Sequence, residues 1–520
     1  MHFLSDFIAF FQGIVGILAF TNVAYVMLLA LAVVVYFILP GARTRGVWLL
    51  LVSLFVFMLF TPALVWIIVL VSAAAWLFAL MLERIQEKNT SFRRFVFIVG
   101  LLTTLGPLLY FKYAGLAVEV TAQIVSFAGT TQMQSPALTL LMPIGISFWT
   151  FQTVAYLVDV YWGKTRAIKN PFWFLLGTTF FPIVTMGPIT RLQKLIPQLQ
   201  TRHRLDYTKM QSGLLLIGWG FFKKLVIADG LAIFVASVFD NPRDFSSMEN
   251  GLIFFVAAAF FAIQLYTDFS GYTDIVRGSA RLFGVDLPLN FRAPYFARTV
   301  GDFWRRWHIT LMDWLHDYVW LTVLYSKPVK RLGLKKRKYL SVMTVFLISG
   351  LWHGAGWTFV VWGLLNGIYQ VAGEILKPFN DWLVKILHIN RSSFSHKLMQ
   401  TGFVFTLLTI AWVFFRANTM SDALYILPRM FMPTVWIFTD ETMVSQGLNF
   451  AQLMIILLAI VVVWVVDFFK GEQGHDILTW FNQQHLIFRW TCYFALILVT
   501  VIFGHYGGVY SAADFIYFQF

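Results

Sequence analysis

The stretch LMIILLAIVVVWVVDFF (453–469) contains a single charged residue, Asp467, in a run of otherwise apolar side chains. Similar runs occur at VAYVMLLALAVVVYFIL (23–39) and FVFIVGLLTTLGPLLYF (95–111). An α-helix needs about 20 mainly apolar residues to cross the hydrocarbon core of a bilayer. Several such runs in one chain predict an all-α polytopic membrane protein, with about 10–12 membrane-embedded helices.

The composition agrees with this class. The chain has 520 residues, of which 59% are hydrophobic and 12% are charged, and so much apolar surface does not fit inside an aqueous core. The net charge of +14 indicates basic loops and contact with lipid head groups rather than nucleic-acid binding. The single cysteine, Cys492, excludes an internal disulfide, and we expect it to pack within a helix rather than to act as a nucleophile.

The distribution of Lys and Arg predicts the topology. Cytoplasmic loops of membrane proteins carry an excess of these residues. We therefore place on the cytoplasmic side the basic segments 41–46, 83–94, 163–170 and 191–204. The opposite, periplasmic side is predicted for the loops 114–135, 240–250 and 418–447 and for both termini.

Two apolar stretches interrupt this alternation because both of their ends are basic. The stretch 171–190 contains Pro182, Gly187 and Pro188, which argue against one straight span, so we expect it to enter the membrane and return. The stretch 340–373 has GLWHGAGW at its middle, which places His353 at the turn of a hairpin deep in the bilayer. Non-helical backbone at that depth is tolerated where protein or a water-filled cavity surrounds it, so we expect a cavity near His353.

A polar interval runs from Asp268 to Tyr339 between the predicted spans and combines arginines with aromatic residues. Its simplest interpretation is an interfacial amphipathic segment, with Trp and Tyr at the head-group level. We expect its carboxylates Asp268, Asp302 and Asp317 to pair with the nearby arginines. Asp159 lies outside this interval, and we expect it to hold a loop. His316 lies within the interval, and we expect it to cap a helix.

His353 has a passive and an active interpretation. A histidine inside a membrane protein is often a hydrogen-bonded packing residue, and Gly350 and Gly354 have a spacing that lets helices approach closely. Gly354, Ala355 and Gly356 also leave room for an acyl thioester beside the imidazole. An imidazole of near-neutral pKa can take a proton from a hydroxyl that attacks an acyl carbonyl, which is general-base acyl transfer. No Cys or clustered carboxylate lies at ligand spacing from His308 or His353, so no metal site is predicted.

Five motifs together resemble the membrane-bound O-acyltransferase family. They are MPIGISFWTFQTVAYLVDVYWG (142–163), FFPIVTMGPITRLQKLIPQL (180–199), DFWRRWHITLMDWL (302–315), SGLWHGAGWTFVVWGLLNG (349–367) and FIYFQF (515–520). The resemblance is greatest to the bacterial branch that contains the membrane subunits of alginate and peptidoglycan O-acetylation. It covers residues from about 140 to the end, and we expect one membrane domain over 1–520 in which 1–140 form less distinct N-terminal helices.

The resemblance implies an acyltransferase of the bacterial inner membrane whose re-entrant segments form a central tunnel. The essential histidine of the family corresponds to His353, and its second characteristic histidine corresponds to His308. The expected acyl donor is acetyl coenzyme A, used as a substrate, with no permanently bound cofactor. His353 would activate the acceptor hydroxyl, and His308 would either orient the thioester or share a proton relay.

Other residues receive roles by the same argument. Arginines make bidentate contacts with phosphate, so the donor phosphates are assigned to Arg305, Arg306 and Arg298. An indole N–H can stabilise an oxyanion, although packing explains these residues equally well, and the tunnel is assigned to Trp304, Trp307, Trp352, Gly354 and Gly356.

The acceptor and the partners stay open at this level. Members of this branch work with an extracytoplasmic partner, so the acetyl group is expected to pass to a periplasmic acetyltransferase and the polysaccharide machinery. One alternative is D-alanyl transfer from a carrier protein. A second is a transporter or channel in which the histidine relays protons, and a third is a scaffold for an envelope synthase.

Overall fold

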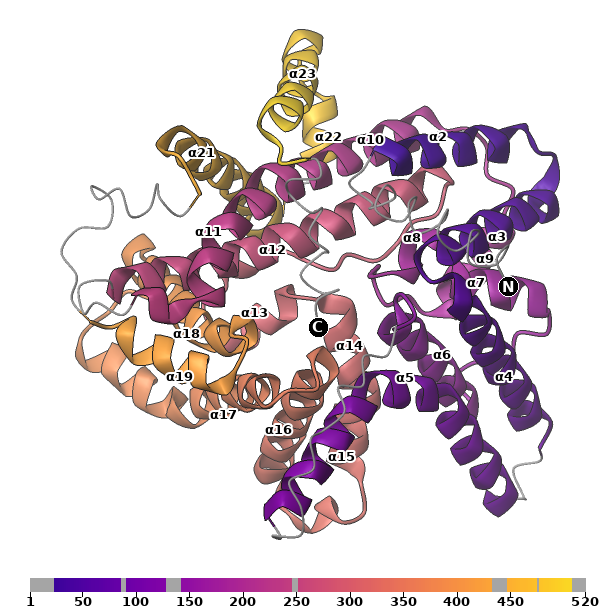
Figure 1. The fold of residues 1–520 in the computed structure, drawn as a ribbon, viewed down its shortest axis with the longest axis horizontal. Coiled ribbons are helices and arrows are strands. Elements are labelled where there is room, and N and C mark those ends of the chain that lie inside the picture. The colour runs from indigo at the N-terminus through magenta and orange to yellow at the C-terminus, as the bar shows by residue number, and fades with distance from the viewer. Residues whose placement is uncertain are drawn as a thin grey trace. The chain divides into compact units, whose positions relative to one another are not determined.

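The computed structural model describes residues 23–85, 90–127, 142–245, 251–432, 447–474 and 477–506 (Figure 1). Every regular element in these ranges is a helix. The chain forms two compact units, which are described separately. The first contains Met1–Ile217 and Thr273–Pro288, and the second contains Gly218–Tyr272 and Leu289–Phe520.

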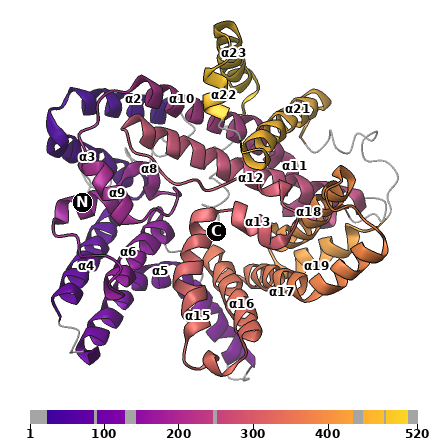
Figure 2. The same ribbon diagram turned by 180° about the vertical axis from the view of Figure 1, so that it is seen from behind.

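The first unit is built from helices of very different length. Its core lies where α4, α6, α7 and α9 meet and includes Ala79, Tyr156, Leu157, Phe174 and Ile196. The helices α4 and α6 run side by side (Figure 2). The elements are α2 (Val23–Ile38), α3 (Gly41–Phe60), η1 (Pro62–Leu64), α4 (Val65–Arg84), α5 (Thr90–Phe127), α6 (Ile146–Tyr161), α7 (Pro171–Thr179), α8 (Phe181–Val184), α9 (Leu192–Gln200) and most of α10 (Tyr207–Phe221).

The second unit begins within α10. The long helix α12 (Gly251–Leu282) starts in this unit and ends in the first. The remaining elements are η2 (Phe222–Ala228), α11 (Asp229–Asp240), η3 (Pro242–Phe245), η5 (Pro294–Phe296), α13 (Val300–Arg306), α14 (Ile309–Leu315), η6 (His316–Trp320), α15 (Leu321–Tyr325), η7 (Val329–Arg331), α16 (Leu334–His353), α17 (Trp357–Ile386), α18 (Phe394–Arg416), α19 (Met420–Arg429), α21 (Phe450–Asp467), η8 (Phe468–Glu472), α22 (Ile477–Asn482) and α23 (Leu486–Phe503).

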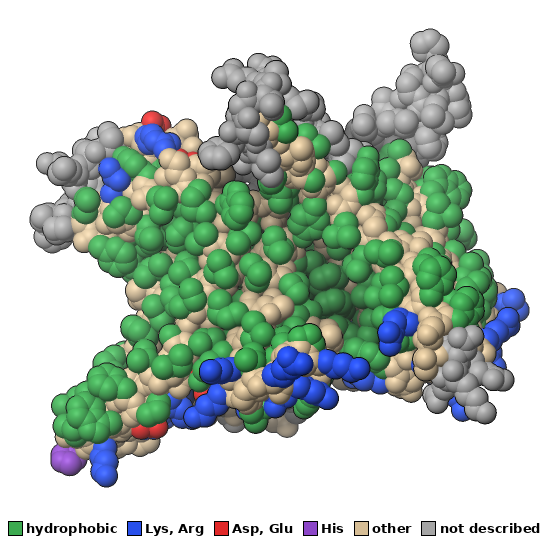
Figure 3. Space-filling model, turned by 90° about the horizontal axis from the view of Figure 1, so that it is seen from below, with side chains coloured by type: hydrophobic (Ala, Val, Ile, Leu, Met, Phe, Trp, Pro, Cys, Tyr) green, Lys and Arg blue, Asp and Glu red, His purple; other side chains and the backbone are tan. Residues whose placement is uncertain are grey.

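Eight helices in the described ranges are long and apolar enough to cross a membrane, and α2 is a shorter apolar helix. Many of their large apolar side chains point outward, such as Trp66 on α4 at 68% exposure and Leu458 on α21 at 67%. Figure 3 shows a face covered mainly by hydrophobic side chains, with Lys and Arg gathered apart from them. Lipid is the solvent that such a surface requires, which confirms the all-α polytopic class.

The stretch 171–190 is broken, as predicted. It forms α7 and α8 with an extended segment after them. The nine residues of α7 extend for roughly 13 Å, less than half of the hydrocarbon thickness. Asn170 caps the start of α7, where its side chain accepts a hydrogen bond from the Phe172 amide, and Pro182 lies in the first turn of the short helix that follows.

The stretch 340–373 forms a helical hairpin, also as predicted. The helices α16 and α17 lie side by side and are joined at Gly354–Gly356, which places His353 at the end of α16 (Figures 1 and 2). A Cβ added to Gly350 would lie 2.4 Å from the Phe359 carbonyl oxygen, and one added to Gly363 would lie 2.4 Å from that of Phe346. The close approach predicted for Gly350 is therefore confirmed, and the glycine that faces it is Gly363 of α17.

Three other expectations were wrong. Residues 114–127, predicted as loop, continue α5, and residues 420–429 form α19, which Thr419 caps by accepting from the Asp422 amide. Residues 114–127 contain no proline, so helix propensity prevails there. The polar interval, expected to be an interfacial amphipathic segment with Trp at the head-group level, folds into several short helices and buries Trp304 and Trp307 at 3% and 1% exposure. Both termini, including FIYFQF, lie outside the described residues.

Candidate active site

His353 lies in a buried aromatic environment in the second unit. It is the last residue of α16, and only 4% of its surface is exposed. Its ring lies edge-on to Trp352, Trp362 of α17 and Phe415 of α18, with centroid separations of 4.8, 5.0 and 5.1 Å. Three helices therefore fix the position of this imidazole.

His308 reaches the same group of residues from a different segment. It joins α13 to α14, has a left-handed backbone with φ of 44°, and is 1% exposed. Its ring packs against Phe269 of α12 at 4.8 Å and against Trp352 at 5.9 Å. Trp352 thus contacts both histidines, and the two sequence-predicted histidines belong to one buried cluster. We call His308, Trp352, His353, Trp362 and Phe415 the histidine cluster.

Asn290 holds His308 on its polar side. The Asn290 Oδ1 lies 3.1 Å from His308 Nδ1 and also accepts hydrogen bonds from the Thr310 amide and hydroxyl. The Asn290 backbone carbonyl accepts from the Ile309 amide at 2.9 Å. Burial lowers the pKa of His308 to about 3, so this imidazole is neutral at physiological pH.

The predicted tunnel tryptophans have different surroundings. The Trp304 Nε1–H donates to Asn366 Oδ1 at 3.2 Å, so it already has a hydrogen-bond partner within the protein. Trp307 packs between Phe303 and Trp412. Trp352 is the one of the three that touches both histidines.

Two buried polar atoms beside His353 have no hydrogen-bond partner in the described part of the chain. They are the Trp362 Nε1 and the Oγ of Ser349, which lies four residues before His353 on α16. Buried donors are normally satisfied, and exceptions often mark functional positions. Trp362 can therefore supply the indole N–H that the sequence argument assigned to Trp304, Trp307 or Trp352.

The predicted glycines differ in the space around them. A Cβ on Gly354 would lie 2.2 Å from ring atoms of Phe359, so the side of Gly354 is filled by that ring. At Gly356 the nearest atom would be 3.6 Å away, which is ordinary contact distance. Gly356 is therefore the position that leaves room beside the hairpin turn.

The three predicted phosphate-binding arginines are not equivalent. Arg306 forms ion pairs with Asp302 and Glu472, and Arg298 pairs with the same glutamate at 3.0 Å. These contacts tie α13 to the end of η8. Arg305 is exposed on α13 and forms no ion pair in the described residues, which makes it the most available of the three for an anionic ligand.

The acidic residues follow the predictions in part. Asp302 pairs with an arginine as expected. Asp268 accepts from Lys224 of η2, which also pairs with Asp229 at 2.8 Å, so a lysine fills its expected ion-pair role. Asp317 lies 3.3 Å from the Nδ1 atom of the exposed His316. Asp159 lies near the end of α6, where its carbonyl accepts from the Lys164 amide.

Sequence reasoning missed Asn290, Trp362, Phe415 and Glu472. Asn290 and Asn366 are fully buried, and an amide inside an apolar stretch is the signal that would have found them. Glu472 is 166 residues from its partner Arg306, and no local spacing connects the two.

Comparison with known proteins places this geometry in context. Residues 164–415 match the family described as MBOAT, membrane-bound O-acyltransferase family. The chain is 32% identical to a "Peptidoglycan O-acetyltransferase" of Helicobacter pylori over 431 residues, 76% of each chain. It is 31% identical to the "Probable alginate O-acetylase AlgI" of Azotobacter vinelandii over 86% of this chain and 84% of the relative. A "Teichoic acid D-alanyltransferase" of Bacillus subtilis is 24% identical over 66% of this chain and 85% of the relative.

Proposed function

Because the chain belongs to the membrane-bound O-acyltransferase family and is an acyltransferase, we propose that it moves an acetyl group from cytoplasmic acetyl coenzyme A across the bacterial inner membrane. The acetyl group is destined for hydroxyl groups of an extracytoplasmic polysaccharide. A periplasmic acetyltransferase receives it and modifies the polymer. The relatives named for peptidoglycan and alginate O-acetylation support this acceptor class.

The observation that carries the proposal is the shared contact of two buried histidines with Trp352. A packing histidine needs no second histidine beside it, whereas proton transfer during acyl transfer is served by two imidazoles in one cluster. Both rings are held by aromatic side chains from separate helices, which keeps their positions fixed.

The proposed reaction conserves every atom. His353 takes the proton of the acceptor hydroxyl while the hydroxyl oxygen attacks the thioester carbon. The carbon–sulfur bond of the resulting intermediate breaks, and the proton passes to the leaving thiolate, so the products are an ester and free coenzyme A. We assign the stabilisation of the negative oxygen of the intermediate to the indole N–H of Trp362, whose ring contacts His353.

The donor is bound through its phosphates. Arg305 is the exposed member of the predicted arginine set, while Arg298 and Arg306 hold the surrounding fold through Glu472. D-alanyl transfer from a carrier protein is the nearest alternative. The greater identity to relatives named as O-acetylating, 32% against 24%, favours acetyl.

The test is acetyl transfer from radiolabelled acetyl coenzyme A by the purified protein in nanodiscs. We expect the wild type to release free coenzyme A and to pass the label to an acceptor or to water. His353→Ala should lose this activity while keeping its thermal stability. A D-alanyl carrier thioester is the parallel donor, and turnover of that donor alone would refute acetyl coenzyme A.

A further inference from the structure

We propose that Asn290 is a positioning residue that fixes His308 in the neutral tautomer with its proton on Nδ1, so that His308 takes part in the reaction as a proton acceptor through Nε2. This inference rests on the proposed function for its mechanistic meaning, but the tautomer itself is measurable without turnover.

The orientation of the Asn290 amide is decided by Thr310. The backbone N–H of Thr310 lies 3.2 Å from the Asn290 side chain and can act only as a donor. The atom that faces it must therefore be Oδ1, because the amide NH₂ in that place would set two donors against each other. The Thr310 hydroxyl donates to the same oxygen at 2.9 Å.

The tautomer of His308 follows from this orientation. The Nδ1 atom lies 3.1 Å from an oxygen that can only accept, so Nδ1 must carry the proton. In a neutral imidazole the other nitrogen, Nε2, then carries no proton and has a lone pair that can accept one. The side chains that pack on the ring from three segments are Phe269, Phe291 and Trp352, and none of them titrates. The titratable neighbour across Trp352 is His353.

The backbone reinforces the side-chain contact. His308 has the left-handed conformation, which is strained for a residue with a Cβ and persists where neighbours fix it. The bond from the Ile309 amide to the Asn290 carbonyl fixes the residue on one side. A hydrogen bond from the Arg292 amide to the Arg306 carbonyl joins the same two segments. Asn290 thus controls both the position and the tautomer of His308.

The assignment separates the two roles considered for His308. An imidazole without a proton on Nε2 cannot donate from that atom to a thioester oxygen, so it does not orient the acyl group in this way. It can receive the proton that His353 has taken from the acceptor hydroxyl. Because burial disfavours the imidazolium form, the proton does not stay on His308 and is returned to the leaving thiolate.

The first measurement is solid-state NMR of the full-length protein with ¹⁵N-labelled histidine in nanodiscs. His308→Gln identifies the signal of His308 among the 10 histidines. We expect a protonated Nδ1 and an unprotonated Nε2 in the wild type at neutral pH. A wild-type signal with the proton on Nε2, or a charged imidazolium, would overturn the proposal.

The second measurement compares Asn290→Leu with Asn290→Asp. The leucine removes the acceptor, so the tautomers should mix and kcat for acetyl transfer should fall about 10–100-fold, while KM for acetyl coenzyme A changes little. The aspartate keeps an acceptor oxygen, so it should keep the tautomer, regain most of kcat and move the acid limb of the pH profile upward through its charge. Loss of activity in both variants with an unchanged tautomer would make Asn290 merely structural.

The control is Asn366→Leu, which removes an equally buried amide that bonds Trp304 instead of a histidine. It should leave the His308 tautomer unchanged, and a tautomer change in this variant would contradict a specific role for Asn290. If the wild type transfers no acetyl group at all, the proposed function fails, while the NMR signal still decides whether Asn290 sets the tautomer.

Discussion

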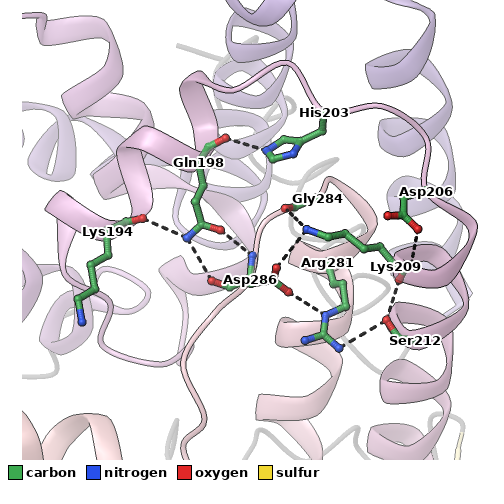
Figure 4. Close-up of polar contacts among 9 residues, drawn as sticks. All are labelled: Lys194, Gln198, His203, Asp206, Lys209, Ser212, Arg281, Gly284 and Asp286. Atoms are coloured by element: carbon green, nitrogen blue, oxygen red, sulfur yellow. Dashed lines mark hydrogen bonds and ion pairs between the residues drawn. The ribbon is translucent and has the colours of Figure 1, made fainter. Parts of the chain in front are cut away.

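Two histidines of this protein, His308 and His203, are held by hydrogen bonds in opposite surroundings. In the second unit, His308 is almost fully buried and bonds Asn290 through Nδ1. In the first unit, His203 uses Nε2 to donate to the Gln198 carbonyl at 2.8 Å (Figure 4). Charged side chains form a network near His203, in which Asp286 accepts from Lys209 at 3.1 Å and from Arg281 at 3.0 Å.

The difference lies in the solvent around the charges. Lys209 and Asp286 expose 39% and 49% of their side chains, so water screens their attraction, and the contact holds the start of α10 against the segment that follows α12. The histidine cluster has aromatic neighbours instead, where a proton acceptor acts in low dielectric. We therefore expect substitutions in the histidine cluster to change chemistry and those in the exposed network to change stability slightly.

The largest effect expected from this comparison is on activity. His353→Ala should reduce acetyl transfer in nanodiscs by about 10²–10⁴-fold, the usual contribution of a positioned general base. His203→Ala should retain wild-type turnover, because its ring serves a backbone contact in the first unit. A comparable loss in both variants would remove the distinction between the two histidines.

A second test compares two lysines. Lys224 is 5% exposed and pairs with both Asp229 and Asp268, so Lys224→Met leaves one buried and one partly buried carboxylate without this cation. We expect the free energy of unfolding to fall by about 3–5 kcal/mol. For Lys209→Met the loss should be about 0.2–1 kcal/mol. Thermal unfolding in detergent, followed by tryptophan fluorescence, measures both, and equal losses would contradict the role given to burial.

Packing of the hairpin gives a smaller effect. A methyl group on Gly363 would meet the carbonyl of Phe346, so Gly363→Ala should destabilise the protein by about 1–3 kcal/mol as α16 and α17 are forced apart. Gly402→Ala on α18 is the matched control, because no atom lies within 4 Å of the added Cβ. Helix propensity should make that variant neutral or more stable by up to about 1 kcal/mol. Destabilisation by both changes would indicate a general intolerance of alanine.

The sequence allowed prediction of those features that depend on local pattern. Apolar runs predicted the spans, Pro182 predicted the break after α7, and the flanking charges of 340–373 predicted the hairpin that carries His353. Helix continuation in α5 was missed, because a loop was inferred from the absence of charge rather than from a helix terminator.

Contacts between segments far apart in the sequence could not be predicted from the local sequence pattern. The bond between Asn290 and His308 depends on a left-handed residue and on a chain reversal that no periodicity encodes. The pairing of Glu472 with Arg298 and Arg306 brings the end of η8 to α13. Two arginines assigned to the donor therefore have structural partners, and the assignment of phosphate binding to them stays a prediction.

The smallest expected effect concerns pH and Asp286. Partial burial works to raise the pKa of this carboxyl, but Lys209 and Arg281 outweigh it and hold the pKa below its usual range. A carboxyl with a lowered folded-state pKa stabilises the protein above its unfolded-state pKa of about 4, and this contribution disappears as pH falls through the folded-state value. Asp286→Asn should therefore cost at most about 1 kcal/mol at pH 7, because half of the side chain is in water.

The same variant should differ less from the wild type on acidification. Unfolding of both proteins in detergent at pH 7 and at about pH 3 measures this directly, since the wild-type carboxyl begins to lose its charge there and the asparagine has none to lose. Lys209 and Arg281 keep their charges over this range, so the change belongs to the carboxylate. If the stability difference between the wild type and the variant instead grows as the pH falls, the exposed network holds its segments by packing. The contrast between this network and the histidine cluster would then lie in hydrogen-bond geometry rather than in charge.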